Sequence, residues 1–401
     1  MIIYLLQIKK LIFYIIFILF YINYCNAFDL NNISNPTVVP KIHANTYILI
    51  DFHSNKVLAE MNADVQHYPA SLVKIMTSYI IGQAIESGRI STEDIVLIEE
   101  EAWAIHNPIL KGSSLMFLKH GDLVSVDQLN KGIILQSGND ACIAIANYIA
   151  GNQNIFVNMM NEYAKVLNLK NTFFKNVHGL DSPGQFSSAR DMALLGRALI
   201  KDLPNQYAIY KEKEFTYNRI RQINRNRLLW DNNINVDGIK TGHTNLSGYN
   251  LVASATKEEM RLISVILGSS SLKECENDTK NLLKWGFRSF KTLMPIESDK
   301  EITSQPVWFG DVKKVKLGSD KNIHFTIPYY RIKDFNIQFS LEEKKLCAPL
   351  KKYQKVGIIS LCLNEEVIEK YPLVVLNEIK FGSFMSRFLD YILYFLYNWL
   401  N

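Results

Sequence analysis

The spacing of apolar residues changes near Met294-Pro295, and this change predicts two domains of different class. Upstream, residues 71–84 and 139–149 carry apolar residues at helical spacing. The β-rich runs of this region lie at both of its ends, at residues 46–51, 56–60, 249–255 and 262–267. Helices between such strands favour an antiparallel sheet covered by helices, so we predict an α/β (α+β) catalytic domain over residues 28–294.

Downstream of Met294-Pro295, the chain consists of short alternating runs separated by turn residues and Pro328. The alternating apolar residues are Ile323, Phe325 and Ile327, followed by Phe335, Ile337, Phe339 and Leu341. A period of two is typical of strands with one buried face. The sequence therefore predicts a small all-β domain over residues 295–380.

Residues 1–27 have the pattern of a removed export signal. Lys9 and Lys10 precede the apolar run 11–24, and Ala27 is a small residue of the kind that signal peptidases accept. The alternative is an uncleaved N-terminal anchor, for which the apolar run is short. In both cases we expect the rest of the chain to be exported.

Export bears on the cysteines, because removal of the signal also removes Cys25. The remaining cysteines are Cys142, Cys275, Cys347 and Cys362. In an oxidising compartment they allow three pairings, among which the sequence does not choose, and buried free thiols are the simpler expectation. The chain has no C-x-x-C or H-E-x-x-H motif, so we predict neither a metal site nor a cofactor.

Residues 381–401 are predicted to form an amphipathic helix. At about 100° per residue, the polar stripe contains Ser383, Ser386, Arg387, Asp390, Tyr394, Tyr397, Asn398 and Asn401. A membrane-spanning helix would bury Arg387, Asp390 and Asn398 at a cost of several kcal/mol. We therefore predict that the helix lies in a membrane interface, the alternative being that it docks onto the chain's own β domain.

The formal net charge of +5 at pH 7 is spread along the chain without a block of Lys and Arg. This distribution supports nucleic-acid binding only weakly and suits an anionic polymer or a membrane surface equally well. We predict no nucleic-acid partner. The composition, 48% hydrophobic and 21% charged, is that of a globular protein and argues against disorder.

Three short motifs occur in a fixed order along the catalytic domain. They are Ser71-Leu72-Val73-Lys74, Ser137-Gly138-Asn139 and Lys240-Thr241-Gly242. Each motif alone arises often by chance, and each has a structural alternative as a helix start, a helix cap or a surface turn. Their order, and their placement at two predicted helix starts and in a strand, indicate serine acyl transfer.

The first motif supplies a nucleophile and its base. The Ser71 hydroxyl is a poor nucleophile until a neighbouring base takes its proton. Lys74 lies three residues further along the predicted helix, on the same side as Ser71, and must be neutral to act as that base. Burial beside a second cation, Lys240, would lower the pKa of Lys74 in the required direction.

The other two motifs supply proton transfer and substrate contacts. Ser137 can pass a proton to the leaving amine, and Asn139 can hold the substrate amide and Lys74 together. Gly242 permits close backbone approach, so that an extended peptide can lie alongside this strand. Lys240 and Thr241 offer a charge and a hydroxyl to a substrate carboxylate.

Longer stretches around these motifs resemble one family. They are 68–71 (YPAS), 136–142 (QSGNDAC), 178–181 (HGLD), 189–193 (ARDMA), 224–226 (NRN), 236–244 (VDGIKTGHT) and 248–255 (GYNLVASA). The sequence is similar to the low-molecular-mass penicillin-binding proteins, which are serine D-alanyl-D-alanine carboxypeptidases of peptidase family S11 and include the principal enterobacterial enzyme. The resemblance covers the chain from the signal to the terminal helix.

The resemblance implies a β-lactamase/transpeptidase-like catalytic domain that removes the terminal D-Ala from peptidoglycan pentapeptides and is acylated by β-lactams. It implies the periplasmic face of the bacterial inner membrane as the location. By matching position, Ser71 would be acylated, Lys74 would be the base, and His243 would give a backbone N–H to the oxyanion hole. Arg225 is expected near the pocket, in support of it. Cys275 is expected where the family would have an arginine that holds the substrate carboxylate.

Other functions remain possible on this fold. A serine β-lactamase would need a deacylating Glu between the second and third motifs, and the nearest candidate, Glu162, does not fit that motif. A D,D-endopeptidase of the same family would use the same residues. A catalytically inactive envelope-binding protein would be expected to have lost the nucleophile or a lysine, and both are present here.

Overall fold

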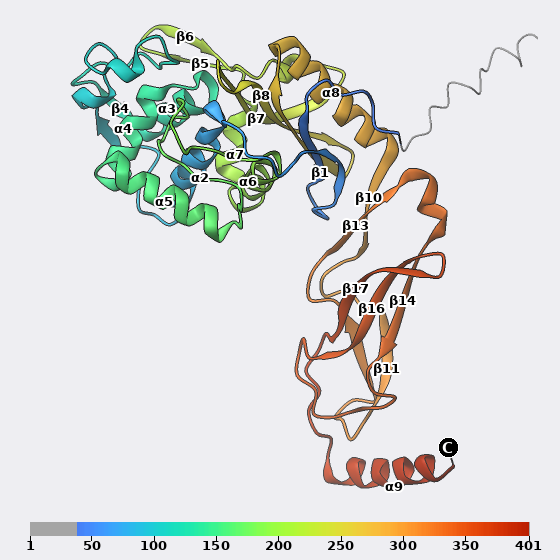
Figure 1. Ribbon diagram of the computed structural model, residues 1–401. Coiled ribbons are helices and arrows are strands. Elements are labelled where there is room, and N and C mark those ends of the chain that lie inside the picture. The colour runs from blue at the N-terminus through green and yellow to red at the C-terminus, as the bar shows by residue number, and fades with distance from the viewer. Residues whose placement is uncertain (1–37, 401) are drawn as a thin grey trace, which may run out of the picture. The chain divides into compact units, whose positions relative to one another are not determined.

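The computed structural model describes residues 38–400 of the 401-residue chain (Figure 1). The predicted export signal at 1–27, and the predicted start of the catalytic domain at residue 28, lie outside the described residues. Within them, the predicted fold class is confirmed: an antiparallel sheet covered by helices is followed by a β-rich domain.

The central sheet of the catalytic domain has five antiparallel strands in the order β2-β1-β9-β8-β7. These strands are β1 (Thr46–Asp51), β2 (Val57–Met61), β7 (Asn235–Thr244), β8 (Gly248–Lys257) and β9 (Met260–Ser269). Strands from the two ends of the domain meet in it, because β1 pairs with β9 along its whole length. The last strand in this order, β7, carries the third motif at an open edge of the sheet.

Helices cover both faces of this sheet (Figure 1). Gly196 of α6 (Ala189–Asp202) approaches Ile263, whereas Gly286 of α8 (Leu272–Ser289) approaches Leu262. Adjacent residues of a strand point to opposite faces, so α6 and α8 lie on opposite sides of the sheet. The other helices of the domain are α2 (Val73–Glu86), α3 (Val126–Lys131), α4 (Asn139–Ala150), α5 (Gln153–Val166) and α7 (Pro204–Ala208).

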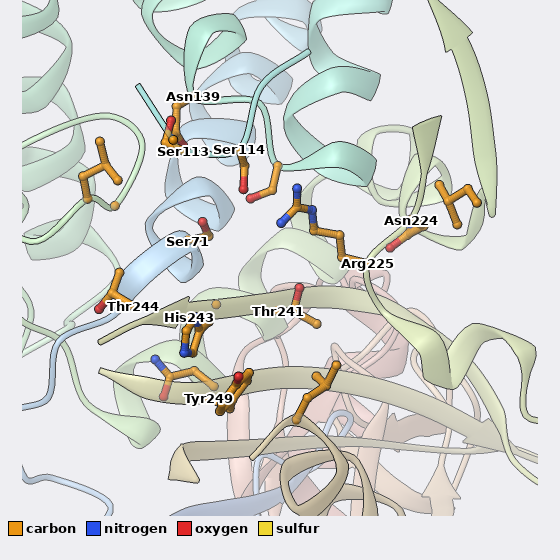
Figure 2. Close-up of a pocket in the computed structure, with 18 of the residues that line it drawn as sticks. Ser71, Ser113, Ser114, Asn139, Asn224, Arg225, Thr241, His243, Thr244 and Tyr249 are labelled. Carbon is orange, nitrogen blue, oxygen red and sulfur yellow. The ribbon is translucent and has the colours of Figure 1, made fainter. Parts of the chain in front are cut away.

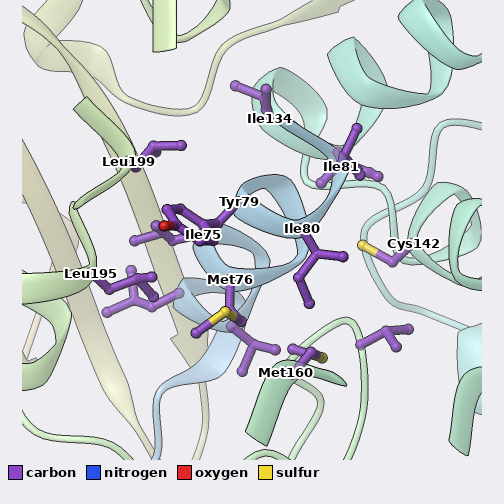
Figure 3. Close-up of a cluster of buried hydrophobic side chains, with 14 of the residues drawn as sticks. Ile75, Met76, Tyr79, Ile80, Ile81, Ile134, Cys142, Met160, Leu195 and Leu199 are labelled. Carbon is purple, nitrogen blue, oxygen red and sulfur yellow. The ribbon is translucent and has the colours of Figure 1, made fainter. Parts of the chain in front are cut away.

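The helix that follows the nucleophile, α2, runs through the core of the domain. Its residues Ile75, Met76, Tyr79, Ile80 and Ile81 are all buried. Figure 3 shows them packed among side chains of other helices, including Ile134, Cys142, Met160, Leu195 and Leu199. A helix buried on all sides holds its first turn rigidly, and the first motif lies at that turn.

Two small antiparallel strand pairs also belong to the catalytic domain. β3 (Ile95–Leu97) pairs with β4 (Leu123–Ser125) across the long connection 98–122, and β5 (Glu214–Tyr217) forms a hairpin with β6 (Ile220–Ile223). The segment after β6 returns to the central sheet through residues 224–230, where the Asn226 side chain donates to the Gly238 carbonyl of β7 at 3.0 Å. This segment therefore borders the edge of β7.

The β domain contains a two-stranded and a six-stranded sheet. The first pairs β10 (Phe290–Ile296) with β13 (Ile323–Pro328), and the second has the order β14-β16-β17-β12-β11-β15. Its strands are β11 (Thr303–Trp308), β12 (Lys314–Gly318), β14 (Phe335–Leu341), β15 (Leu346–Cys347), β16 (Lys355–Leu363) and β17 (Glu366–Val375). The alternating runs are strands, but Ile337 and Phe339 stay partly exposed because β14 is an edge strand.

The last helix, α9 (Phe384–Leu400), contacts the β domain through Asp390 of the predicted polar stripe. Asp390 is buried and accepts hydrogen bonds from the Phe309 N–H at 3.0 Å and the Lys313 ammonium at 2.8 Å. Phe384, Met385, Phe388, Leu389, Tyr391, Ile392, Leu393, Phe395 and Leu396 of the same helix are exposed. Among the described residues, no helix combines the length and apolar character needed to cross a bilayer.

Candidate active site

The nucleophile and its base lie at the start of α2. Ser71 is in a 3-10 turn, Ala70–Leu72, that leads directly into the helix. Lys74 follows one turn later, and its ammonium is 3.1 Å from the Ser71 hydroxyl. The Lys74 ammonium also donates to the His178 carbonyl. The predicted proximity of Ser71 and Lys74 is therefore present in the folded chain.

The environment of Lys74 favours its neutral form. Only 1% of the residue is exposed, and this burial lowers the pKa of Lys74 from its ordinary 10.5 to about 8. The positive charge of Arg225 acts in the same direction, while Cys142 and Asp140 oppose it. A lysine with a pKa of about 8 has a useful neutral fraction near neutral pH, as a general base requires.

The second motif presents unpaired polar atoms. Ser137 adopts a left-handed conformation (φ 67°) at the end of the π-helical turn Gly132–Gln136, and Asn139 begins α4. Both side chains are buried, and among the described residues the Ser137 hydroxyl and the Asn139 carbonyl oxygen have no hydrogen-bond partner. Buried polar atoms without partners are costly, so these two are suited to receive substrate groups.

A neighbouring carboxylate holds the loop that faces the second motif. Asp140 is fully buried and accepts hydrogen bonds from the backbone N–H groups of Met116 (2.8 Å) and Leu118 (3.1 Å). The Asn139 N–H donates to the Ser114 carbonyl at 2.8 Å. These bonds place Ser113 and Ser114 against the second motif.

The third motif lies on β7, close to the nucleophile. A Cβ atom at Gly242 would be 3.1 Å from the Pro69 carbonyl oxygen and 3.2 Å from the Ser71 nitrogen, so this close approach favours glycine. Lys240 is buried, and this burial lowers its pKa well below the ordinary value. The positive charge of Lys74 acts in the same direction with a smaller effect. The exposed His243 ring stacks on Tyr249, with ring centroids 4.0 Å apart.

A cavity of about 960 Å³ brings these elements together (Figure 2). Its walls contain Ser71, Ser137, Asn139, Thr241, Gly242, His243 and Arg225, which are predicted site residues. Lys74 and Lys240 do not line it and lie buried beside it. Arg225 was expected only to support the pocket, but it forms part of the wall and its pKa is lowered by burial.

Sequence reasoning missed several residues of the cavity wall. Ser113, Ser114, Leu180, Tyr249 and Asn250 line it, and Figure 2 shows Ser113 and Ser114 across the cavity from Thr241. Stretches 178–181 and 248–255 belonged to the resemblance, but nothing in their spacing marked individual side chains as pocket residues. Only the tertiary structure brings these segments to the nucleophile.

The expectation for Cys275 is wrong. Cys275 is buried within α8, outside the cavity wall, and burial raises the pKa of its thiol to about 12. The residue of α8 that lines the cavity is Leu272. Cys142, Cys275 and Cys362 are buried free thiols, in agreement with the simpler of the two expectations.

One group of side chains elsewhere has the spacing of metal ligands. Ligand atoms of His43, Glu274 and Asp278 lie within 4.8 Å of one another. Asp278 already accepts hydrogen bonds from the backbone N–H groups of His43 and Ala44, and Glu274 accepts one from the Ser270 hydroxyl. These bonds explain the cluster as a structural link between the start of the domain and α8.

Comparison with protein families identifies the chain. Residues 32–271 match the family model described as D-alanyl-D-alanine carboxypeptidase, and residues 290–380 match the penicillin-binding protein 5 C-terminal domain. The chain belongs to the D-alanyl-D-alanine carboxypeptidase family. As a member, it is a serine-type D-Ala-D-Ala carboxypeptidase, which confirms the predicted activity.

Several members of this family resemble the chain over most of its length. The D-alanyl-D-alanine carboxypeptidase DacA of Escherichia coli K12 is 55% identical over 381 residues, which cover 95% of this chain and 94% of that protein. DacC of the same organism is 54% identical over 90% of both chains. Penicillin-binding protein 5 from Haemophilus influenzae is 47% identical with a TM-score of 0.81, covering 86% of this chain and 99% of that one.

Proposed function

We propose that this carboxypeptidase removes the terminal D-Ala of peptidoglycan pentapeptides through an acyl-enzyme on Ser71. The observation that carries the proposal is the Lys74 ammonium, buried and 3.1 Å from the Ser71 hydroxyl, with its pKa lowered to about 8. An amine so placed can take the hydroxyl proton without the cost of first removing a strongly held proton of its own.

In the acylation step, neutral Lys74 takes the Ser71 proton and the serine oxygen bonds to the carbonyl carbon of the penultimate D-Ala. The backbone N–H groups of Ser71 and His243 stabilise the resulting oxyanion, where one donor is worth roughly 2.7–4 kcal/mol. Ser137 relays this proton from Lys74 to the amine of the terminal D-Ala, and the C–N bond breaks, which leaves Lys74 neutral again. Free D-Ala leaves, and the remaining peptide stays esterified to Ser71.

In the deacylation step, water replaces the leaving amine. Lys74 takes a proton from the water, whose oxygen bonds to the ester carbonyl carbon. The ester C–O bond breaks, and the Ser71 oxygen recovers a proton. The shortened peptide is released as a carboxylate, so the enzyme returns to its starting state.

Substrate contacts follow from the cavity wall. The extended peptide lies along the open edge of β7, as an added strand would. The terminal carboxylate meets the Thr241 hydroxyl and the Arg225 guanidinium, with the charge of Lys240 nearby. Asn139 offers its unpaired carbonyl oxygen to a substrate N–H group.

The same geometry supports covalent inhibition by β-lactams at Ser71. Penicillin-binding protein D2 from Listeria monocytogenes, solved in an ampicillin-bound form, is 26% identical, with a TM-score of 0.54, over 62% of this chain and 99% of its own. A β-lactam carbonyl would be attacked by Ser71 in the way a peptide carbonyl is. The ring opens, and the drug stays attached as an ester.

We further propose that the enzyme is exported by residues 1–27 and works on the periplasmic face of the bacterial inner membrane, held there by residues 381–401. The support is the exposed apolar side of α9, to which Phe384, Phe388 and Phe395 contribute. Burial of such side chains in the interface gains about 25 cal/mol for each Å² of apolar surface. Residues 381–401 contain no lysine and a single arginine, so apolar burial rather than lipid charge would carry the binding.

The deciding experiment measures release of D-alanine from a peptide that ends in D-Ala-D-Ala, by the protein without its signal and by Ser71→Ala. We expect release by the first protein and none by the second. Labelled penicillin should acylate only the protein that retains Ser71. Acylation without D-alanine release would point to a D,D-endopeptidase, and the absence of both would point to an envelope-binding protein.

A further inference from the structure

A polar cluster beneath β7, outside the substrate cavity, has no part in the mechanism above. The Asp237 carboxylate accepts a hydrogen bond from the Tyr207 hydroxyl at 2.6 Å and two contacts from Arg261, at 2.9 and 2.8 Å. Tyr207 is on α7, Asp237 on β7 and Arg261 on β9. We call these three residues the β7 clamp, since they tie three elements together at one carboxylate.

The β7 clamp lies at an irregularity in the strand. The pairing of β7 with β8 shifts register between Val236 and Gly238, so Asp237 has no partner across the ladder. Bulges of this kind bend a strand and redirect the side chains that follow, and they are frequent beside active sites. Lys240 and Thr241 come directly after this bulge.

The side chains around the bulge are closely packed and leave the backbone at Gly238 little room to move. A Cβ atom at Gly238 would lie 2.7 Å from the Tyr207 hydroxyl oxygen, so a larger residue there would displace the Tyr207 side chain. Arg261 also donates to the Ser254 hydroxyl at 2.7 Å, and its guanidinium lies over the Tyr207 ring, 5.5 Å from the centroid. Charge-assisted and bidentate contacts of this type fix geometry more tightly than neutral hydrogen bonds.

Lys240 depends on the strand for its placement. Its ammonium is buried, and the contact found for it within the described chain is a 3.3 Å hydrogen bond to the carbonyl of its neighbour Thr241. No ion pair joins it to a carboxylate among the described residues. Its position relative to Ser71 is therefore set mainly by the backbone of β7, whose upstream end is the bulge.

We propose that Tyr207, Asp237 and Arg261 are positioning residues that fix the bulge of β7 and, through it, the placement of Lys240, Thr241 and the oxyanion donors. This inference rests on the proposed acyl transfer at Ser71. Displacement of these groups by a fraction of an ångström weakens transition-state contacts and lowers the rate, because catalysis depends steeply on geometry.

The test variant is Tyr207→Phe, which removes the hydroxyl that bonds Asp237 and keeps the ring. Tyr210→Phe is the matched control: the Tyr210 ring stacks on that of Tyr207 with centroids 5.6 Å apart, and it is also buried. Its hydroxyl is not among the groups that bond Asp237 in the described structure. Both variants therefore lose one buried phenol oxygen from the same pair of stacked rings. Only Tyr207→Phe also loses a hydrogen bond to Asp237.

Two quantities are measured with labelled penicillin: the fraction of molecules that can be acylated and the acylation rate constant of those molecules. We expect Tyr207→Phe to keep a normal fraction and to acylate about tenfold more slowly, with a parallel loss in kcat for D-alanine release. Tyr210→Phe should stay within about twofold of the wild type in rate. A purely structural role would lower the fraction and leave the rate constant of the folded molecules unchanged.

Arg261→Lys provides a second variant in case Tyr207→Phe does not fold. This variant keeps the positive charge but loses the bidentate contact with Asp237, so we expect it to slow acylation as well. Wild-type rate constants in both variants, or equal losses in Tyr207→Phe and Tyr210→Phe, would overturn the positioning role. An unreactive wild-type protein would instead refute the proposed acylation of Ser71, so the two failures are distinguishable.

Discussion

At the scale of single residues, the protonation of Lys74 should set the pH dependence of acylation. The amine must lose its proton to act as a base, and its pKa is lowered from 10.5 to about 8. The neutral fraction therefore rises as the pH approaches 8 and levels off above it. We expect the acylation rate constant with labelled penicillin to follow this curve between pH 6 and 10.

The matched variant for this prediction is Lys74→Arg, which keeps a cation but cannot lose its proton in this range. We expect it to acylate at least about 100-fold more slowly at every pH. A wild-type rate that is still climbing steeply at pH 10 would mean that burial does not perturb the pKa of this lysine. Rapid acylation by the arginine variant would assign the role of base to another group.

At the scale of elements, the N-terminal turn of α4 is joined to the loop 113–118 through one carboxylate. Asp140 accepts hydrogen bonds from Met116, Leu118 and its neighbour Ala141, all at 2.8–3.1 Å. Asp140→Ala would leave these buried N–H groups unpaired. A lost hydrogen bond to a charged group costs roughly 1.5–3 kcal/mol, so we expect the free energy of unfolding to fall by about 3 kcal/mol.

Urea unfolding of Asp140→Ala measures this loss, with Asp127→Ala as the comparison. Asp127 forms a surface ion pair with Lys131 one turn further along α3, and such pairs are worth about 0.3–0.5 kcal/mol. Equal stability of the two variants would show that water satisfies the exposed N–H groups. The loop 113–118 would then be held by other contacts.

At the scale of the whole molecule, catalysis and membrane binding should be separable. The cavity is built entirely from residues 71–272, whereas α9 begins at Phe384. We expect deletion of residues 381–401 to give a soluble protein whose release of D-alanine from a soluble peptide equals that of the full mature chain. Fractionation of cells that express each form, followed by the D-alanine assay, measures both properties.

A point variant refines this prediction, because deletion also removes the contacts of Asp390. Phe388→Asp with Leu389→Asp places two charges on the exposed apolar side of α9 and keeps Asp390 in contact with Lys313. We expect this double variant to be found in the soluble fraction, as the truncated protein is. Truncated protein that persists in washed membranes would contradict the proposed role of this helix.

The sequence alone determined the local structures and the chemistry of the three motifs. Alternation and helical spacing located β1, β2, β8, β9, α2 and α4, and in the β domain β13 and β14, because side-chain burial follows the period of each element. The i and i+3 positions of Ser71 and Lys74 were enough to predict their contact, since one helical turn fixes that distance.

Only the tertiary structure decided what lies around these motifs. It put Arg225 into the cavity wall, kept Cys275 out of it, and exposed Ile337 and Phe339 at an edge strand. It also joined Tyr207, Asp237 and Arg261 beneath β7. Such contacts join residues far apart in the chain, and they depend on how helices and strands pack, which local periodicity does not encode.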